Sequence, residues 1–344
     1  MANYKRQVTI SDVAEMAGVS KATVSHFINE RYDYMSNETR LRIKAVIEET
    51  NFRPNTIARS LKLKHTKLIG IIMHNLEHQG KMLLVSGICD ALNEAGYSPL
   101  IFNSYNDSTI EKQNIATCIE HQVDGIIFSP CSADFDYYNK ICEDSSIPFT
   151  LVNRYVDEWH YDAAYIDHYN IVMSALNQLY DNGFDQIAFL TSNKSLISTK
   201  KRREEAFEDF VEEKLHGNSF GIIRLPSHEG NILPLLKDEV QFFRNKVEGR
   251  KALFAVDADM LYWTVTAVQE LGVSIPNEMG LCGYDDLNWG ALTTPSITTI
   301  TQPLWELGSA AGRTLVKRLS GRLSAEPQIS RIEGILTIRA STKA

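Results

Sequence analysis

The sequence predicts a small all-helical head followed by a larger α/β core made of two parallel-sheet subdomains. Apolar residues recur at helical spacing through the first 52 residues. From residue 68 onward, short runs rich in Ile, Leu, Val and Phe alternate with helical stretches. Charge divides the chain at nearly the same point, because residues 1–67 carry a net charge of +5 and the rest carry −13. At 344 residues, the chain is long enough for two or three domains.

The composition excludes several classes of protein. No window of about 18 consecutive apolar residues occurs, so no membrane span is predicted. The N-terminus lacks the apolar region of a secretory signal, which favours a cytoplasmic location. The five cysteines are scattered, without a C-x-x-C pair, and indicate free thiols rather than disulfides or a zinc site. A basic head on an acidic body favours a polyanionic partner for the head, with an ordinary solubilising segment as the alternative.

The first helices of the head are marked by their caps. Apolar residues fall at i, i+3, i+4 and i+7 over residues 10–17, and Thr9 with Asp12 forms a possible capping box. Gly18 is expected to end this helix, because glycine tolerates the left-handed conformation of a tight turn. Ser20 is expected to cap the next helix, so the spacing is that of a helix-turn-helix.

The second helix is expected to expose a face of small or polar residues suited to a DNA major groove. This face consists of Lys21, Ala22, Ser25, His26 and Asn29. A third helix is expected from after Ser36 to near Asn51, with an apolar side made by Leu41, Ile43, Val46 and Ile47. The alternative is a three-helix bundle whose polar residues are merely solvated.

The segments "TISDVAEMAGVSKATVSHFIN", "SNETRLRIKAVIEETNFRPN" and "ARSLK" resemble the head of the lactose/purine repressor (LacI/GalR) family of bacterial transcription factors. The resemblance implies that Lys21, Ala22 and His26 contact base edges. It also implies DNA contacts, mainly positioning ones, at Thr9, Ser20, Thr23, Ser25 and Asn29.

The sequence of the connector, residues 53–66, predicts a short helix that begins near Pro54. A helix of about two turns is marginal in water, so we expect it to fold only when docked. The resemblance implies a hinge helix that orders on DNA, with Leu61 as a wedge between base pairs and Ala58 at the helix contact. Asn55 and Lys62 are the other DNA contacts implied there. The alternative for Leu61 is an ordinary buried leucine.

The core shows apolar strands without polar alternation, separated by helices, which predicts parallel sheets covered on both faces. No dinucleotide-binding, P-loop, metalloprotease or nucleophile motif occurs, so an enzyme is disfavoured and no cofactor or metal is expected. Ligands of such sheets bind beyond the carboxyl ends of the strands. Polar residues at those positions are Asn75, Gln79, Lys81, Asn103, Ser104, Ser129, Asn153, Arg154, Ser192, Asp257 and Asp285.

The core also resembles the effector-binding part of the same repressor family, with two Rossmann-like subdomains similar to type I periplasmic sugar-binding proteins. The landmarks are "VDGIIFSP", "LYDNGFDQIAFL", "GVSIPNEMGLCGYDD" and "PSITTITQP". The implied effector-binding residues are Gln79, Lys81, Ser129, Arg154, Arg203, Asp257, Asp285 and Trp289.

Two departures from the family bear on the effector. The usual N-P-F-F after the first strand is replaced by His78-Gln79-Gly80-Lys81, so an aromatic stack is lost and a cation is gained. Arginine forks suit carboxylates and phosphates, and the sequence therefore favours an acidic sugar, such as a uronate or keto-deoxy sugar acid. The alternative has Lys81 facing solvent and Arg154 paired with Asp157 or Asp285.

The expected organisation is a DNA-binding head over residues 1–52, a hinge over 53–66 and a core over 67–344. The expected subdomains are about 67–166 with 298–328, and about 167–297 with 329–344. The expected function is a homodimeric repressor of a carbohydrate-utilisation operon that binds a pseudo-palindromic operator and responds to a sugar-type effector. The alternative is a cytoplasmic carbohydrate-binding protein without a DNA role.

Overall fold

The computed structural model describes residues 8–52, 65–77, 79–132, 134–154, 158–192, 198–217, 219–226, 232–285 and 288–343. Contacts divide the chain into two compact units, Met1–Thr66 and Lys67–Ala344. The helices of the first unit are α1 (Ile10–Met16), α2 (Lys21–Ile28), the 3-10 turn η1 (Tyr32–Tyr34) and α3 (Asn37–Thr50).

The caps predicted for the head are present. Thr9 and Asp12 form the capping box of α1, and the side chain of Ser20 accepts a hydrogen bond from the N–H of Thr23. Gly18 has φ +63°, the left-handed conformation that favours glycine at this turn. Asn51 ends α3 in the same conformation.

The core of the head is formed by Val13, Val24 and Ile43, each fully buried. The prediction that Leu41 belongs to the apolar side of α3 is wrong, because that side chain is 67% exposed. Leu41 lies two positions before Ile43, about 200° around the helix, so both cannot point to one core. The hinge residues Asn55, Ala58, Leu61 and Lys62 lie outside the described residues, and their roles stay predictions.

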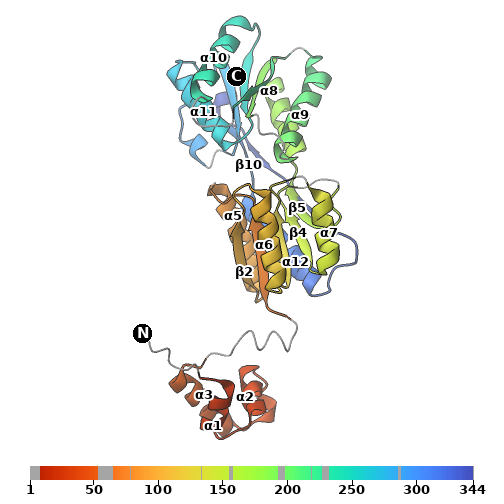
Figure 1. Cartoon of the computed structure of the whole chain (residues 1–344). Coiled ribbons are helices and arrows are strands. Elements are labelled where there is room, and N and C mark those ends of the chain that lie inside the picture. The colour runs from red at the N-terminus through yellow and green to blue at the C-terminus, as the bar shows by residue number, and fades with distance from the viewer. Residues whose placement is uncertain are drawn as a thin grey trace, which may run out of the picture. The chain divides into compact units, whose positions relative to one another are not determined.

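The first sheet of the core is parallel in the order β11-β5-β4-β3-β1-β2, and with its helices it forms the first subdomain (Figure 1). Its strands are β1 (Leu68–Met73), β2 (Ser98–Asn103), β3 (Gly125–Ser129), β4 (Phe149–Val152), β5 (Asp162–Ile166) and β11 (Ile329–Ile332). Helices α5 (Gln79–Glu94) and α12 (Leu304–Leu319) pack on one face. Helices α6 (Ser108–Glu120) and α7 (Phe135–Ser145) pack on the other.

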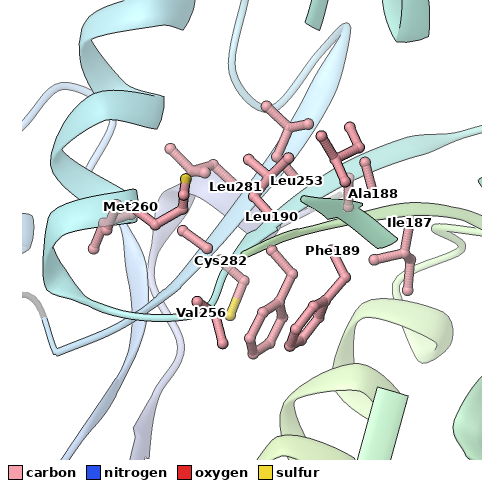
Figure 2. Packing of buried hydrophobic residues seen from close by; sticks show 14 of the residues in the cluster. Ile187, Ala188, Phe189, Leu190, Leu253, Val256, Met260, Leu281 and Cys282 are labelled. Carbon is pink, nitrogen blue, oxygen red and sulfur yellow. The ribbon is translucent and has the colours of Figure 1, made fainter. Parts of the chain in front are cut away.

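The second sheet has the order β12-β10-β9-β8-β6-β7, with only β12 antiparallel to its neighbour. Its strands are β6 (Gln186–Ser192), β7 (Gly221–Leu225), β8 (Lys251–Ala255), β9 (Met279–Tyr284), β10 (Thr298–Thr301) and β12 (Ile335–Thr337). Helices α8 (His168–Asp181), α9 (Ser198–Leu215), α10 (Ile232–Lys246) and α11 (Ala258–Glu270) complete the second subdomain. Figure 2 shows its core, where side chains of the central strands pack against α11.

The assignment of two segments to subdomains differs from the prediction. Residues 298–301 were expected in the first subdomain, but β10 pairs with β9 of the second sheet. Residues 329–332 were expected in the second subdomain, but β11 pairs with β5 of the first sheet. The chain therefore crosses between subdomains later than expected, after Thr301 and again after Ile332. The hydroxyl groups of Thr298 and Ser341 explain the first case, because they bind β10 to the C-terminal segment of the second subdomain.

Candidate functional site

The predicted recognition face of α2 is open. Lys21, Ala22 and Asn29 are exposed, and Ser25 and His26 are half-buried. Small and polar side chains on one face of an exposed helix leave room for a partner's surface to approach. The predicted contacts Thr9, Ser20 and Thr23 are engaged in helix caps, which suits residues that fix the backbone rather than read bases.

The ring of His26 is held by an aromatic neighbour that sequence reasoning did not select. Its centroid lies 5.2 Å from that of Tyr34, in an edge-to-face arrangement. Tyr34 itself is 75% exposed, so η1 extends the open surface of α2. The ring of Tyr32 in the same turn carries the guanidinium of Arg40 at 3.9 Å, which ties η1 to α3.

A cavity of about 550 Å³ lies within the core, between the two subdomains. Parallel strands bring their carboxyl ends to one edge, so residues that follow different strands meet there. The lining residues are His74, Asn75, Gly80, Lys81, Leu83, Asn106, Asn153, Arg154, Thr199, Lys200, Arg203, Asp257, Ala258, Asp259, Asp285, Asn288, Thr301, Gln302 and Leu304. The sequence-predicted Lys81, Arg154, Arg203, Asp257 and Asp285 are therefore brought together in one place.

Two cations line the cavity from the first subdomain. Lys81 lies in the first turn of α5, and it faces the cavity rather than bulk solvent. Burial, then the neighbouring Arg154 charge, lowers the pKa of Lys81 to about 7, with Asp285 opposing and Arg203 adding to the shift. Arg154 follows β4, is nearly fully buried, and donates a hydrogen bond to the backbone oxygen of Pro130.

Arg203 is the central cation of the second subdomain. Its guanidinium lies 3.5 Å above the ring of Tyr284 and donates to the backbone oxygen of Val256 at 2.7 Å. The side chain is 4% exposed, and its Nε has no hydrogen-bond partner among the described residues. A planar guanidinium held on one face by an aromatic ring keeps its remaining N–H groups in a fixed direction.

A neutral histidine lies beneath Arg203. Burial, then the charges of Arg203 and Lys81, lowers the pKa of His168 well below its usual value. Its Nδ1 lies 2.7 Å from the Tyr284 hydroxyl and 3.4 Å from a guanidinium nitrogen of Arg203. Because the ring is neutral and both neighbours donate, Nδ1 accepts and the proton is on Nε2.

Asp257 and Asp285 are two of the three carboxylates that line the cavity from the second subdomain. Asp257 caps α11 and lies 2.5 Å from Lys200 Nζ. Burial raises the pKa of Asp257, but the Lys200 charge and hydrogen bond outweigh burial and hold this pKa below its usual value. Asp285 accepts a hydrogen bond from Gln302, which lies where the chain crosses between subdomains. Burial raises the pKa of Asp285 despite the nearby Arg203.

Three predicted effector residues do not contribute a described side chain to the cavity. Ser129 is fully buried and hydrogen-bonded to Nδ1 of His74 at 3.0 Å, so it supports a lining residue instead. Trp289 packs against the core of the second subdomain. Gln79 lies in α5, but its side chain is outside the described part of the chain. The prediction that Ser129 and Trp289 line the effector site is therefore not supported by the geometry.

Sequence reasoning also missed lining residues. Lys200 lies three positions before Arg203 on the same helix, so helical spacing was a usable signal for it. Gln302 directly follows β10, so the strand-end rule was a usable signal for it too. His74 directly follows β1, so the strand-end rule applies to it as well.

We expect Lys81→Met to stabilise the unliganded protein. The unfolded chain binds a proton at Lys81 up to a pKa near 10.5, whereas the folded chain holds it only up to about pH 7. Charged Lys81 therefore opposes folding fully below pH 7, and this penalty declines as pH rises toward 10.5. The variant should gain about 1–3 kcal/mol in the free energy of unfolding at pH 7 and roughly half of that at pH 9, measured by urea denaturation.

Lys200→Met is the matched control for this stability measurement. Lys200 is paired, and its removal leaves the carboxylate of Asp257 without its cation. That variant should lose stability at pH 7, because an unpaired charge in a largely buried site is unfavourable. If both variants lost stability at pH 7, the charge of Lys81 would not oppose folding as we predict.

Comparison with known proteins identifies the family. The model for bacterial regulatory proteins of the lacI family matches residues 9–55, and a periplasmic binding protein-like domain matches residues 176–342. The HTH-type transcriptional regulator KdgR of Bacillus subtilis (strain 168) is 31% identical, covering 97% of this chain and 97% of that protein. The chain belongs to the LacI family. It is a DNA-binding transcriptional regulator with a helix-turn-helix head and a periplasmic-binding-like core.

Other LacI-family proteins match over nearly the full length. The regulator PtxS of Pseudomonas putida is 29% identical over 99% of this chain and 98% of its own. The lac repressor dimer bound to operator and the anti-inducer ONPF superposes with a TM-score of 0.84 at 21% identity, covering 98% of this chain and 100% of that chain. A complex of the regulator CelR with cellobiose gives a TM-score of 0.68 at 20% identity, covering 97% of this chain and 100% of that chain. These structures share the fold.

Two further observations concern this LacI-family chain. Within the described residues, no group of three or more His, Cys, Asp or Glu side chains is placed to hold a metal ion. None of the helices in the described ranges combines the length and apolar character needed to cross a membrane.

Proposed function

We propose that this LacI-family regulator is a homodimeric repressor of a carbohydrate-utilisation operon that binds a pseudo-palindromic operator and is switched by a small sugar acid. The observation that carries the effector class is the meeting of Lys81, Arg154 and Arg203 in one cavity. In the described lining, four cationic side chains face three carboxylates, an excess of one positive charge when Lys81 is protonated. A neutral sugar does not compensate a charged Lys81, whereas one carboxylate balances the charge.

Several features support the remaining parts of the proposal. The open face of α2 and the basic head suit a phosphate backbone. The roles of Lys21, Ala22 and His26 as base contacts, and of Leu61 as a wedge, are retained here as proposals. A sugar-type ligand agrees with the cellobiose in the CelR complex and with the ribose in another LacI-family structure, which has a TM-score of 0.67 and 23% identity.

Operator binding is tested with a palindromic duplex selected from a randomised library by the full-length protein. The logarithm of the association constant should fall with the logarithm of salt concentration by about 0.9 per phosphate neutralised. The selected duplex should compete far better than an unrelated duplex of equal length. A weak, flat response would contradict the DNA-binding function, and a carbohydrate-binding protein without a DNA role would then be favoured.

The effector class is tested by thermal melting with matched pairs of compounds. Glucuronate, galacturonate, 2-ketogluconate and 2-keto-3-deoxygluconate are compared with glucose and galactose. At least one acid should raise the melting temperature and change operator binding, since a ligand that binds only the folded state stabilises it. Stabilisation by the neutral sugars alone would overturn the acidic class while leaving the regulator intact.

Exposed apolar side chains on the core suit the proposed homodimer. In the first subdomain, Met82 and Ile101 are 53% and 47% exposed, and β2 is an edge strand. In the second subdomain, Phe242 and Tyr262 are 53% and 57% exposed. Large apolar side chains at a sheet edge and on neighbouring helices are typical of protein interfaces. Sedimentation of the full-length chain as a monomer at micromolar concentration would contradict this part of the proposal.

A further inference from the structure

The two walls of the cavity differ in charge. Among the described residues, the lining from the first subdomain includes the cations Lys81 and Arg154 but no carboxylate. The lining from the second subdomain mixes Lys200 and Arg203 with three carboxylates, Asp257, Asp259 and Asp285. An asymmetric ligand with one anionic end therefore has a preferred orientation in this cavity, with its carboxylate toward the first subdomain.

Lys81 differs from the other cations in its lack of partners. Lys200 is paired with Asp257, and Arg203 is stacked on Tyr284. Lys81 makes no hydrogen bond or ion pair with any residue in the described part of the chain. It also lies in the first turn of the 16-residue helix α5, where the helix dipole disfavours a cation and favours an anion. An anion placed here would pair with the ammonium group of Lys81 and interact favourably with the helix dipole at the N-terminus of α5.

The neighbouring lining offers a group for the rest of the ligand. Asn153 directly precedes Arg154, is 5% exposed, and its side-chain oxygen has no hydrogen-bond partner among the described residues. A buried amide oxygen without a partner is unfavourable unless a ligand donates to it. A sugar hydroxyl next to the carboxylate supplies that donor.

We propose that Lys81 and Arg154 bind the carboxylate of the effector, and that effector binding brings a proton from solvent onto Lys81. This inference rests on the proposed sugar-acid function and deepens it, because it makes the regulator's response to the acid dependent on pH. A neutral ligand in the same cavity has no reason to recruit the proton.

The charged and titratable groups around Lys81 fix the direction of this effect. Arg154 after β4 and Arg203 on α9 disfavour a charged Lys81, whereas Asp285 after β9 favours it, and burial dominates. His74 after β1, and Lys200, Asp257 and Asp259 from the second subdomain, line the same cavity. Glu77 precedes α5, and Asp90 is the first acidic residue within it.

The protonation state of Lys81 before and after binding gives the expected number of protons taken up and the expected change of affinity with pH. With a pKa of about 7, the ammonium form makes up roughly one-tenth of the free protein at pH 8. A carboxylate in contact with the amine raises its pKa, so binding at pH 8 takes up about 0.9 proton. The association constant should then fall roughly 50-fold between pH 7 and pH 9. Arg154, whose pKa burial lowers to about 10, keeps its charge over this range.

Calorimetric titration of the full-length protein tests the inference. Each of the four acids is titrated at pH 8 in HEPES and in Tris, because the dependence of the measured enthalpy on the buffer gives the number of protons taken up. The wild type should take up about 0.9 proton with the acid that binds. Lys81→Arg, which stays charged at every pH used, should take up less than about 0.2 proton and show little change in affinity between pH 7 and pH 9.

Two further variants test the contribution of Lys81 to affinity and the source of the proton. Lys81→Met should weaken binding of the acid at pH 7 by roughly 30-fold or more. His74→Gln should leave the proton uptake of the wild type in place, which excludes the histidine as its source. Thermal melts of the unliganded variants show that each is folded.

The outcomes distinguish this inference from the function on which it rests. Equal proton uptake by the wild type and Lys81→Arg would overturn the role of Lys81 while leaving the sugar-acid effector intact. Loss of the uptake only in His74→Gln would assign the proton to the histidine and also overturn it. Failure of all four acids to bind would overturn both the effector class and this inference, but not the operator binding measured separately.

Discussion

Gly308→Ala is expected to destabilise the core by about 3 kcal/mol or more, because the added methyl group has no room between two helices. A Cβ at this position would lie 2.0 Å from the backbone oxygen of Leu84 and 3.0 Å from the backbone nitrogen of Ile88. Both atoms belong to the backbone of α5, so no rotamer change relieves the clash. The two helices must separate, and the apolar contacts between them are lost. Urea denaturation of the full-length protein measures the effect.

The contact is reciprocal, which provides a second test and a control. Gly87 of α5 faces α12 in the same way, because its Cβ would lie 2.0 Å from the backbone oxygen of Trp305. Gly87→Ala should therefore be about as harmful as Gly308→Ala. Gly321 has φ +67°, but a Cβ added there would meet nothing within 4 Å, so Gly321→Ala should lose only about 1 kcal/mol from backbone strain. A loss at Gly308 no larger than that at Gly321 would contradict close helix packing.

The close packing of α5 also bears on the cavity. Lys81 lies in the first turn of α5, six residues before Gly87. The glycine contacts set the distance of α5 from α12, and thereby fix where the Lys81 side chain starts. Gly308→Ala should therefore reduce the effector response and the stability together, because one displacement of α5 affects both.

The sequence predicted the cavity better than it predicted the boundaries of the subdomains. Arg154, Asp257 and Asp285 were found by one rule, since each follows a buried strand and parallel strands end at a common edge. No comparable rule says which of two similar sheets a strand joins. The runs at 298–301 and 329–332 are compatible with either sheet, and only tertiary hydrogen bonds such as that between Thr298 and Ser341 decide.

The sequence also could not predict which side chains pair with one another within the site. The spacing of Arg203 and Lys200 placed both on one face of α9, but nothing in the sequence indicated that Lys200 would pair with Asp257, 57 residues later. Ser129 is the last residue of β3, at the strand end that the rule selects, yet it is fully buried and hydrogen-bonded to His74. Position at a strand end is thus not sufficient for lining the cavity, because the direction of the side chain also decides it.

Arg203→Lys is expected to weaken effector binding by about 100-fold or more, roughly 3 kcal/mol, while retaining the positive charge. The guanidinium makes three directed contacts at once: it stacks on Tyr284, donates to Val256 and lies 3.4 Å from His168 Nδ1. A lysine ammonium is a point charge without a flat face or a fork. It reproduces the Coulomb attraction and loses the fixed direction of the N–H groups.

Arg203→Lys should lose the response to sugar acid but keep its binding to operator DNA. Arg203 lies in the core, and the proposed recognition residues lie in the separate helical head. The variant should still bind the selected operator duplex, but sugar acid at a concentration that saturates the wild type should no longer change that binding. Operator titrations with and without acid, together with the melting shift, measure the two effects separately.

The neighbouring position offers the same substitution as a control. Arg202 is exposed and forms an ion pair with Glu205 at 3.0 Å, without lining the cavity. Exposed ion pairs contribute little, so Arg202→Lys should bind effector and operator as the wild type does. If Arg203→Lys and Arg202→Lys respond to the same concentration of acid, the guanidinium geometry is not what selects the effector. A loss in Arg203→Lys alone shows that direction, and not charge, makes the contact, because both variants keep the same net charge.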